Sequence, residues 1–361
     1  LAFGAPLVAL VLAARRRVRP AALVAAAAAG LALTVSLAIY LPQAAVYRGP
    51  VLAASLSYRA QVYHVTGCPQ DPAGDHFVGL SNLLGVMGRG GLKFYKSTAV
   101  SPVAGPGGIV AANDVVIIKI NYQWDQRGGT NTDLLRGLIH SIVHHPDGFT
   151  GEVIVCENAQ YTPIYALDRP LNNAQDSGQS PHDVVVAFQG QGDNVSHFDW
   201  TAIRGVQVGE YSAGDTNDGY VVAAYDDRWQ GRLSYPKFRS AAGTCVSLKA
   251  GVWNAGSGTY DRARLKFINV PVLKSHHATY GATASVKHYM GVVTSQFSTN
   301  AHSAIAAGIM GALMAEIQMA DQPAHHTLQP TALVHEAWMK LVDTKEARFE
   351  GRGQFFSLAS H

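Results

Sequence analysis

Five side chains that can carry positive charge follow one apolar, strand-like segment within residues 268–291. They are Lys274, His276, His277, Lys287 and His288. Open α/β sheets bind their ligands in the crevice beyond the carboxyl ends of the strands. Ammonium groups gathered there favour a carboxylate or a phosphate, and each lowers the pKa of its neighbours, which makes a lysine reactive near neutral pH. The stretch therefore predicts a site for something anionic or metal-bound.

A second set of polar side chains ends two other apolar runs of the chain. Lys119 and Asn121 end the first run, and Glu157 ends the next one. If the strands are neighbours, Lys119 and Asn121 converge on one crevice with Lys274 and His276. In that crevice His276 is expected to carry protons, while Glu157 orients it or acts as the opposing acid.

These side chains divide by chemistry into two groups of candidates. The candidate catalytic residues are Lys274, His276, Lys287 and Glu157, and the candidate substrate-binding residues are Lys119, Asn121, Thr132, His288 and His302. A plainer interpretation is that Lys119 and Lys274 end their strands in solvent and that His276 is a hydrogen-bonded loop residue. No residue is assigned to a metal, and the cofactor is left open.

Apolar patterning predicts an α/β domain that positions these residues. Continuous β-branched runs, typical of strands buried in a parallel sheet, occur at 113–121, 151–158 and 266–273. Apolar residues at helical spacing over 134–143 predict a helix between the first two strands. Asn131 or Thr132 is expected to cap it. Strand, helix and strand form a βαβ unit, whose crossover is expected to be right-handed.

The remaining segments predict peripheral structure around this unit. The region 159–250 is rich in Gly, Asp, Asn and Gln, and we expect loops with peripheral strands at 183–188 and 219–225. Residues 302–319 carry an apolar face at helical spacing, which predicts a helix packed on the sheet. The expected fold class is α/β, with a mostly parallel or mixed sheet and flanking helices. We expect an N-terminal transmembrane helix or helices before this domain and a short helical tail after it.

Two blocks resemble the proteins grouped as domain of unknown function 362, over roughly residues 110–320. The first block is a strand ending in K-x-N, then a threonine-bearing loop, a helix and a strand with an acidic end; here these are Lys119, Asn121, Thr130, Thr132 and Glu157. The second reads N-x-P-x-L-K-x-H followed by a threonine-bearing loop and a K-x-x-M-G end; here these are Asn269, Pro271, Leu273, Lys274, His276, Thr279, Thr283, Lys287, Met290 and Gly291. Downstream, His302 also fits.

The chain departs from the family pattern at two positions. Ile120 stands where the family usually has Pro, and His288 stands where it usually has Asn. The cysteine-rich ferredoxin modules that accompany many relatives have no counterpart in this sequence. What the resemblance implies is an α/β domain with one split site made by both blocks. The arrangement also loosely resembles lactate-racemase-type enzymes, in which Lys and His act on a 2-hydroxy acid.

Charge and cysteine content limit the classes of partner. Setting aside the cluster Arg15, Arg16, Arg17 and Arg19 leaves 24 of the 28 basic residues against 25 acidic ones. The remainder is therefore nearly neutral, and no nucleic-acid partner is expected. Cys68, Cys156 and Cys245 lie far apart without a CxxC pair, so no iron–sulfur cluster is expected either.

The N-terminal region predicts a link to a membrane. Residues 21–42 form a charge-free apolar run that is long enough to span a bilayer. The arginines before it favour a cytoplasmic N-terminal flank, which places the following domain outside. We expect residues 1–47 to be a membrane anchor that leaves the main domain, 48–322, extracytoplasmic. The alternatives are a signal region, with export after cleavage, and a buried Ala-rich helix.

The C-terminal residues resemble a different protein class. Residues 328–361 are similar to the start of the first conserved helical region of extracytoplasmic-function sigma-70 factors. The similarity lies in an LQPTALVHEA helix and in a following stretch with Phe349, Arg352, Phe355, Phe356, Leu358 and Ala359. We interpret 323–361 as a truncated, foreign sigma-like fragment, joined by fusion or by an assembly error. Such a piece alone is not expected to support transcription.

Three functions from different classes remain open on this evidence. The first is a membrane-anchored or exported enzyme that acts on a small anionic metabolite in a Lys/His crevice. The second is a non-catalytic module that binds an anion, a cofactor or a metal. The third, suggested by the tail alone, is a sigma-70-like transcription factor.

Overall fold

A computed structural model of the protein describes residues 63–65, 76–123, 129–160, 174–176, 178–225, 231–272, 274–275, 282–283 and 285–301. The predicted anchor at 21–42, the predicted helix at 302–319 and the sigma-like tail lie outside these residues. Among the helices that are described, none combines the length and the apolar character needed to cross a membrane. The described part is an α/β fold with parallel and mixed sheets.

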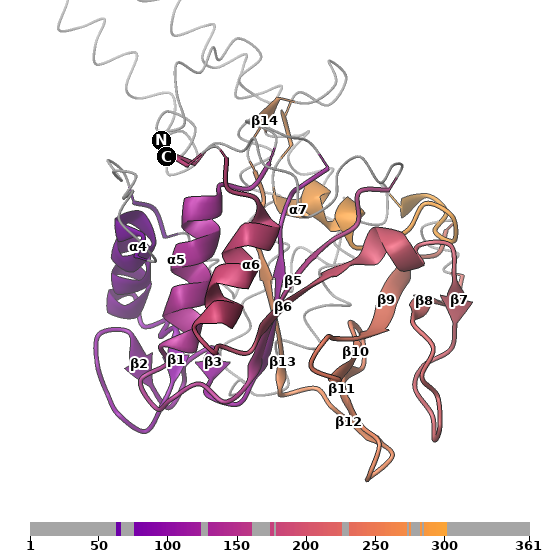
Figure 1. Cartoon of the computed structure of the whole chain (residues 1–361), viewed down its shortest axis with the longest axis horizontal. Helices are drawn as coiled ribbons and strands as arrows, with labels where there is room; N and C mark the ends of the chain where they lie inside the picture. Colours follow the sequence, from indigo (N-terminus) through magenta and orange to yellow (C-terminus); the bar gives the residue numbers. More distant parts are fainter. Residues whose placement is uncertain are drawn as a thin grey trace, which may run out of the picture. The chain divides into compact units, whose positions relative to one another are not determined.

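A four-stranded parallel sheet forms the centre of the fold, in the order β13-β4-β5-β6 (Figure 1). Its strands are β4 (Val115–Lys119), β5 (Glu152–Glu157), β6 (Val195–Asp199) and β13 (Leu265–Asn269). Every residue of β4 and β5 is buried, as expected for β-branched strands that are covered on both faces. In the register, Asn269 lies opposite Lys119, and Lys119 lies opposite Cys156. The carboxyl ends of three strands therefore meet at one edge.

Helices cover one face of this sheet (Figure 1). They are α4 (Val78–Arg89), α5 (Thr132–Val143) and α6 (Pro181–Gly190). Val116 and Ile118 of β4 point into the apolar core beneath them, while Val115 and Ile117 point into a second core on the opposite face. This alternation is the two-residue period of a β-strand.

A six-stranded sheet covers the opposite face, in the order β12-β11-β10-β9-β8-β7. Its strands are β7 (Gln207–Val208), β8 (Gly219–Val222), β9 (Ser234–Arg239), β10 (Cys245–Ser247), β11 (Gly251–Asn254) and β12 (Thr259–Asp261). Its pairs are antiparallel except for β7 with β8. Tyr220, Phe238 and Val246 of this sheet pack in the same core as β4 and β5.

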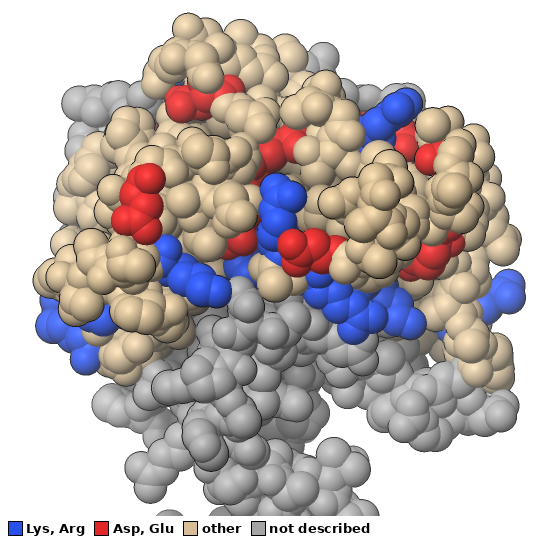
Figure 2. All heavy atoms as spheres, turned by 90° about the horizontal axis from the view of Figure 1, so that it is seen from below, with Lys and Arg blue, Asp and Glu red and all other residues tan. Residues whose placement is uncertain are grey.

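Short elements complete the described part. Strands β1 (Tyr95–Lys96), β2 (Ala104–Gly105) and β3 (Val110–Ala111) form a small parallel sheet, and β14 (Lys274–Ser275) pairs with β15 (Ala282–Thr283). The remaining helical turns are η2 (Trp200–Ile203), α7 (Ser285–His288) and η3 (Tyr289–Gly291). On the face in Figure 2, acidic and basic side chains lie in small separate groups among uncharged residues.

Three sequence-based expectations about the elements need correction. Residues 183–188 lie in helix α6 rather than in a strand, because Ser180 and Asp183 form a capping box and Pro181 begins the helix. The region 159–250, expected to hold loops with peripheral strands, contributes β7 to β10 to a six-stranded second sheet, in which β8 lies within the strand expected at 219–225. The strand predicted at 266–273 ends at Asn269, so Lys274 lies in the separate hairpin of β14 and β15 instead of at the end of β13.

Helix α5 begins where the sequence predicts, and Asn131 is its N-cap. The Asn131 side chain accepts a hydrogen bond from the Leu134 N–H at 3.1 Å. We expect Asn131→Ala to lower the free energy of unfolding by about 1 kcal/mol, because one backbone donor loses its acceptor. Urea unfolding measures this loss, and Asn131→Ser, which keeps an acceptor oxygen, should retain most of the stability. An unchanged midpoint for the alanine variant would count against the cap.

Candidate functional site

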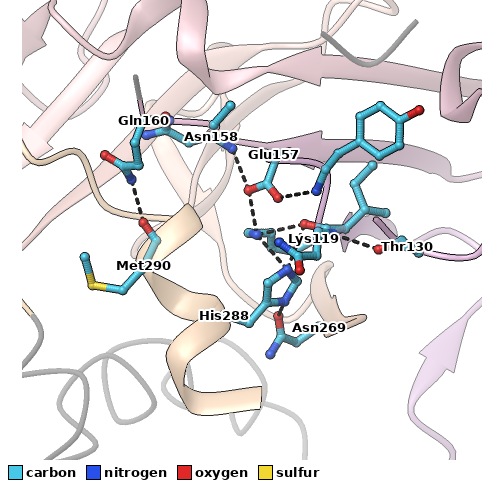
Figure 3. Close-up of polar contacts among 12 residues, drawn as sticks. Lys119, Thr130, Glu157, Asn158, Gln160, Asn269, His288 and Met290 are labelled. Atoms are coloured by element: carbon cyan, nitrogen blue, oxygen red, sulfur yellow. Dashed lines mark hydrogen bonds and ion pairs between the residues drawn. The ribbon is translucent and has the colours of Figure 1, made fainter. Parts of the chain in front are cut away.

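Four elements bring polar side chains together at the carboxyl end of the parallel sheet (Figure 3). Lys119 ends β4, Glu157 ends β5, Asn269 ends β13, and His288 ends α7. The exposed fractions of Lys119, Glu157 and His288 are 0%, 3% and 5%. Strand order accounts for this cluster, because β13, β4 and β5 are consecutive neighbours.

The Lys119 ammonium group contacts three polar atoms of the protein. Its Nζ lies 2.6 Å from Glu157 Oε1, 2.8 Å from the Ile120 carbonyl oxygen and 2.9 Å from His288 Nε2. An ammonium group has three donors and no acceptor. When His288 Nε2 carries no proton, all three hydrogens of Lys119 have acceptors in the protein and none is left for a ligand.

The Glu157 carboxylate is held from several sides. Its Oε2 accepts from the Tyr122 N–H at 2.8 Å, and its Oε1 accepts from the Asn158 N–H at 2.9 Å and from Lys119. Burial raises the pKa of Glu157, although Lys119 and the two N–H groups oppose the rise. Burial also lowers the pKa of Lys119 against the pull of Glu157. Desolvation thus acts on both groups in the direction of their neutral forms.

His288 links Lys119 to the end of the neighbouring strand. Its Nδ1 lies 2.6 Å from Asn269 Oδ1, and its Nε2 lies 2.9 Å from both Lys119 Nζ and the Ile120 carbonyl oxygen. Figure 3 shows the imidazole between the two side chains. Both ring nitrogens therefore contact the protein, and the imidazole joins strands β4 and β13.

Residues 287–293, here called the capping segment, are fastened over this cluster by two amide side chains. The Gln160 side chain donates to the carbonyl oxygens of Met290 and Val293, each at 2.6 Å, and accepts from the Ser295 N–H at 3.2 Å (Figure 3). Gln160 adopts the left-handed conformation, with φ of 66°, which is uncommon for a residue other than glycine. Asn158 Nδ2 also donates to the Val293 carbonyl oxygen, at 3.1 Å.

The capping segment comes so close to the ion pair that only glycine fits at position 291. A Cβ built on Gly291 would overlap Lys119 Nζ and Glu157 Oε1. A glycine at this position therefore has a physical explanation: the backbone itself lies against the buried ion pair.

Some of the predicted site residues occupy positions around the cluster. The Asn121 N–H donates to Thr130 Oγ1 at 2.7 Å, and the Thr130 hydroxyl lies 3.4 Å from the Val270 carbonyl oxygen. Thr132 is fully buried at the start of α5. Lys287 is half-buried, and burial lowers its pKa.

Other predicted residues have no described side chain. Lys274 lies in β14, where its backbone pairs with Thr283, but its side chain is not described. His276 and His302 lie outside the described residues. Whether Lys119 and Lys274 share one crevice therefore stays a prediction. The strands β4 and β13 are neighbours, but Lys274 lies in β14 and not at the end of β13, as the prediction assumed.

Sequence reasoning missed three side chains of the network. The sequence places Asn269 in the second block but not among the candidate site residues, and it does not single out Asn158 or Gln160. The signal that selected Glu157, a polar side chain directly after a buried strand, applies equally to Asn158 and Gln160. The described residues contain no group of three or more His, Cys, Asp or Glu side chains placed to hold a metal ion.

Comparison with known proteins gives one match. A family model described as ECF sigma factor matches residues 312–361. This match begins upstream of the resemblance found at 328–361, and the matched residues lie outside the described ones. No curated protein and no solved structure matches the chain. The α/β part, including the cluster around Lys119, thus has no counterpart among these comparisons.

Proposed function

We propose that the chain binds a small anionic metabolite at the carboxyl end of its parallel sheet and moves a proton on it. This is the function expected from the Lys and His side chains that follow the strands of the sheet. The observation that carries the proposal is the buried network of Lys119, Glu157, Asn269 and His288 at three adjacent strand ends. Buried ionisable groups with pKa values moved toward neutrality occur preferentially at functional sites.

The energetic cost of the network supports a role beyond stability. Removing two charges from water costs several kcal/mol per ion, and a well-packed apolar pair of similar volume is often at least as stable. The chain nevertheless places a lysine and a glutamate at the strand ends, where open α/β sheets bind their ligands. Proton transfer is favoured when the proton affinities of donor and acceptor approach each other, and the opposite directions of the Lys119 and Glu157 pKa shifts act in that sense.

The anion itself needs cations other than Lys119, whose three hydrogens already have acceptors within the protein. Lys287 of the capping segment is half-buried and lies one residue from His288. We assign anion binding to Lys287 together with Lys274, and proton transfer on the ligand to His276. Lys119, Glu157 and His288 form a buried network at the strand ends.

Isothermal titration with L-lactate, acetate and inorganic phosphate tests the binding half of the proposal. At least one of these probes should bind, and Lys287→Met should weaken its binding about 10- to 100-fold, because a hydrogen bond to a charged group contributes about 1.5–3 kcal/mol. The control is Lys249→Met, a partly buried lysine beside β10 in the second sheet, which should bind as the parent does. Failure of all three probes, or equal effects of the two substitutions, would overturn the proposal.

Proton exchange separates an enzyme from a binding module. In D2O, exchange of the Cα proton of bound L-lactate, followed by proton NMR, should proceed with the parent protein. It should be lost in His276→Ala, while binding persists. Binding without any exchange on lactate by the parent protein would favour the non-catalytic module and reject the catalytic half.

A second candidate function rests on the match of residues 312–361 to ECF sigma factors. Proteins of that class act with RNA polymerase, so the full chain would be expected to retain core RNA polymerase in a pull-down with purified components. Retention that is lost when residues 312–361 are deleted would support this candidate. A chain that does not retain the polymerase would dismiss it.

A further inference from the structure

We propose that Asn269 is a positioning residue that holds His288 as a neutral imidazole with its proton on Nδ1. In this form His288 Nε2 is a bare acceptor for the Lys119 ammonium group. The functional importance of this inference rests on the proposed function, because the inference assigns Asn269 a part in preparing the proton-transfer network. Its evidence is the geometry of the described residues alone.

The Asn269 contact determines which nitrogen carries the proton. Asn269 Oδ1 is a carbonyl oxygen, which accepts hydrogen bonds and cannot donate them. It lies 2.6 Å from His288 Nδ1, so Nδ1 must be the donor. A neutral imidazole has one N–H, which leaves Nε2 with a free lone pair.

The surroundings of Nε2 agree with this assignment. Nε2 lies 2.9 Å from Lys119 Nζ, which has only hydrogens to offer. A second ring proton would place an imidazolium against the Lys119 ammonium group in a buried site, where like charges are costly. The Ile120 carbonyl oxygen accepts from Lys119 at 2.8 Å and also lies 2.9 Å from Nε2. It could therefore accept a hydrogen bond from the alternative tautomer, in which the proton is on Nε2. Asn269 decides between the two tautomers.

A chain of hydrogen bonds follows from this choice. Lys119 donates to His288 Nε2 and to Glu157 Oε1, while His288 Nδ1–H donates to Asn269. If the proton on Nδ1 moved to Nε2, the imidazole would donate to the Ile120 carbonyl oxygen and Lys119 would lose one of its three acceptors. Asn269 thereby keeps the Lys119 proton directed at the imidazole.

Nitrogen NMR of the histidine rings tests the inference without any ligand. In protein labelled with 15N on histidine, with His288→Gln used for assignment, His288 should show a protonated Nδ1 and an unprotonated Nε2 near neutral pH. In Asn269→Ala the acceptor is lost, and a substantial share of the ring should change to the Nε2–H tautomer. Asn269→Asp restores an acceptor oxygen and should return the proton to Nδ1.

Each result decides the inference. A parent protein with its proton on Nε2, or with a doubly protonated His288, would overturn the assignment. A parent tautomer as expected but unchanged in Asn269→Ala would show that Asn269 does not position the ring. If Asn269→Ala fails to fold, the parent spectrum and Asn269→Asp still decide. Because the spectra need no anion, failure of the probes to bind and failure of this inference are distinguishable.

Discussion

Lys119→Met is expected to lower the free energy of unfolding by about 3–5 kcal/mol, the range typical when one partner of a buried ion pair is removed. The substitution fills the space of the lysine stem but leaves Glu157, which is 3% exposed, without its counter-charge. Equilibrium unfolding in urea measures the loss. The double variant Lys119→Met with Glu157→Gln should recover a large part of it, because the second change removes the unpaired buried charge.

The loss in Lys119→Met should also depend on pH. Burial raises the pKa of Glu157, and Lys119 opposes this rise. Removing Lys119 therefore moves the folded-state pKa of Glu157 further above its ordinary value. Between the unfolded and the folded pKa the folded state then binds more protons, so stability rises as pH falls through that window. The deficit should therefore be smaller at about pH 5 than at about pH 8.

A matched control comes from the same sheet. Lys266 of β13 is also buried, with its Nζ 3.7 Å from Asp114 Oδ2. Lys266→Met removes a buried lysine but breaks a longer ion pair, so its deficit should be smaller than that of Lys119→Met and should lack the dependence on Glu157. Equal deficits with the same pH dependence in both variants would contradict a special role for the pair at the strand ends.

Gly291→Ala is the second substitution with a large expected effect. The new Cβ would overlap the Lys119 ammonium nitrogen and a Glu157 oxygen, so the capping segment or the ion pair must shift. Overpacking of this kind costs about 1–3 kcal/mol. The shift should also disturb the contact of His288 with Lys119, so the His288 ring signals should change along with the urea midpoint.

Gly107→Ala separates a steric effect from a general effect of removing a glycine. A Cβ at Gly107 meets nothing within 4 Å, so this variant should unfold close to the parent midpoint. A Gly291→Ala variant that is as stable as the parent and keeps the parent His288 spectrum would show that the capping segment does not lie against the ion pair.

Local patterns were sufficient for the central βαβ unit. The β-branched runs before Lys119 and Glu157 lie in strands β4 and β5, and helix α5 begins after a capping side chain as predicted. Burial on both faces makes such strands apolar at every position, and this signal is contained in short segments. The same short-range signal gave a wrong prediction at residues 183–188. A short apolar run does not distinguish a strand from the buried face of a helix.

The sequence by itself determined which side chains stand at the ends of β4 and β5, because each of these strands and its last polar residue occupy a few consecutive positions. Only the tertiary structure decided that β13, β4 and β5 are neighbours, and hence that Lys119 meets Glu157. It also decided that His288, far along the chain, contacts that ammonium group, and that Lys119, Glu157 and His288 are buried. The physical reason is that burial and pairing are properties of contacts between distant segments. The chemistry of the cluster follows from those contacts, since desolvation is the largest cause of the pKa shifts of both Lys119 and Glu157.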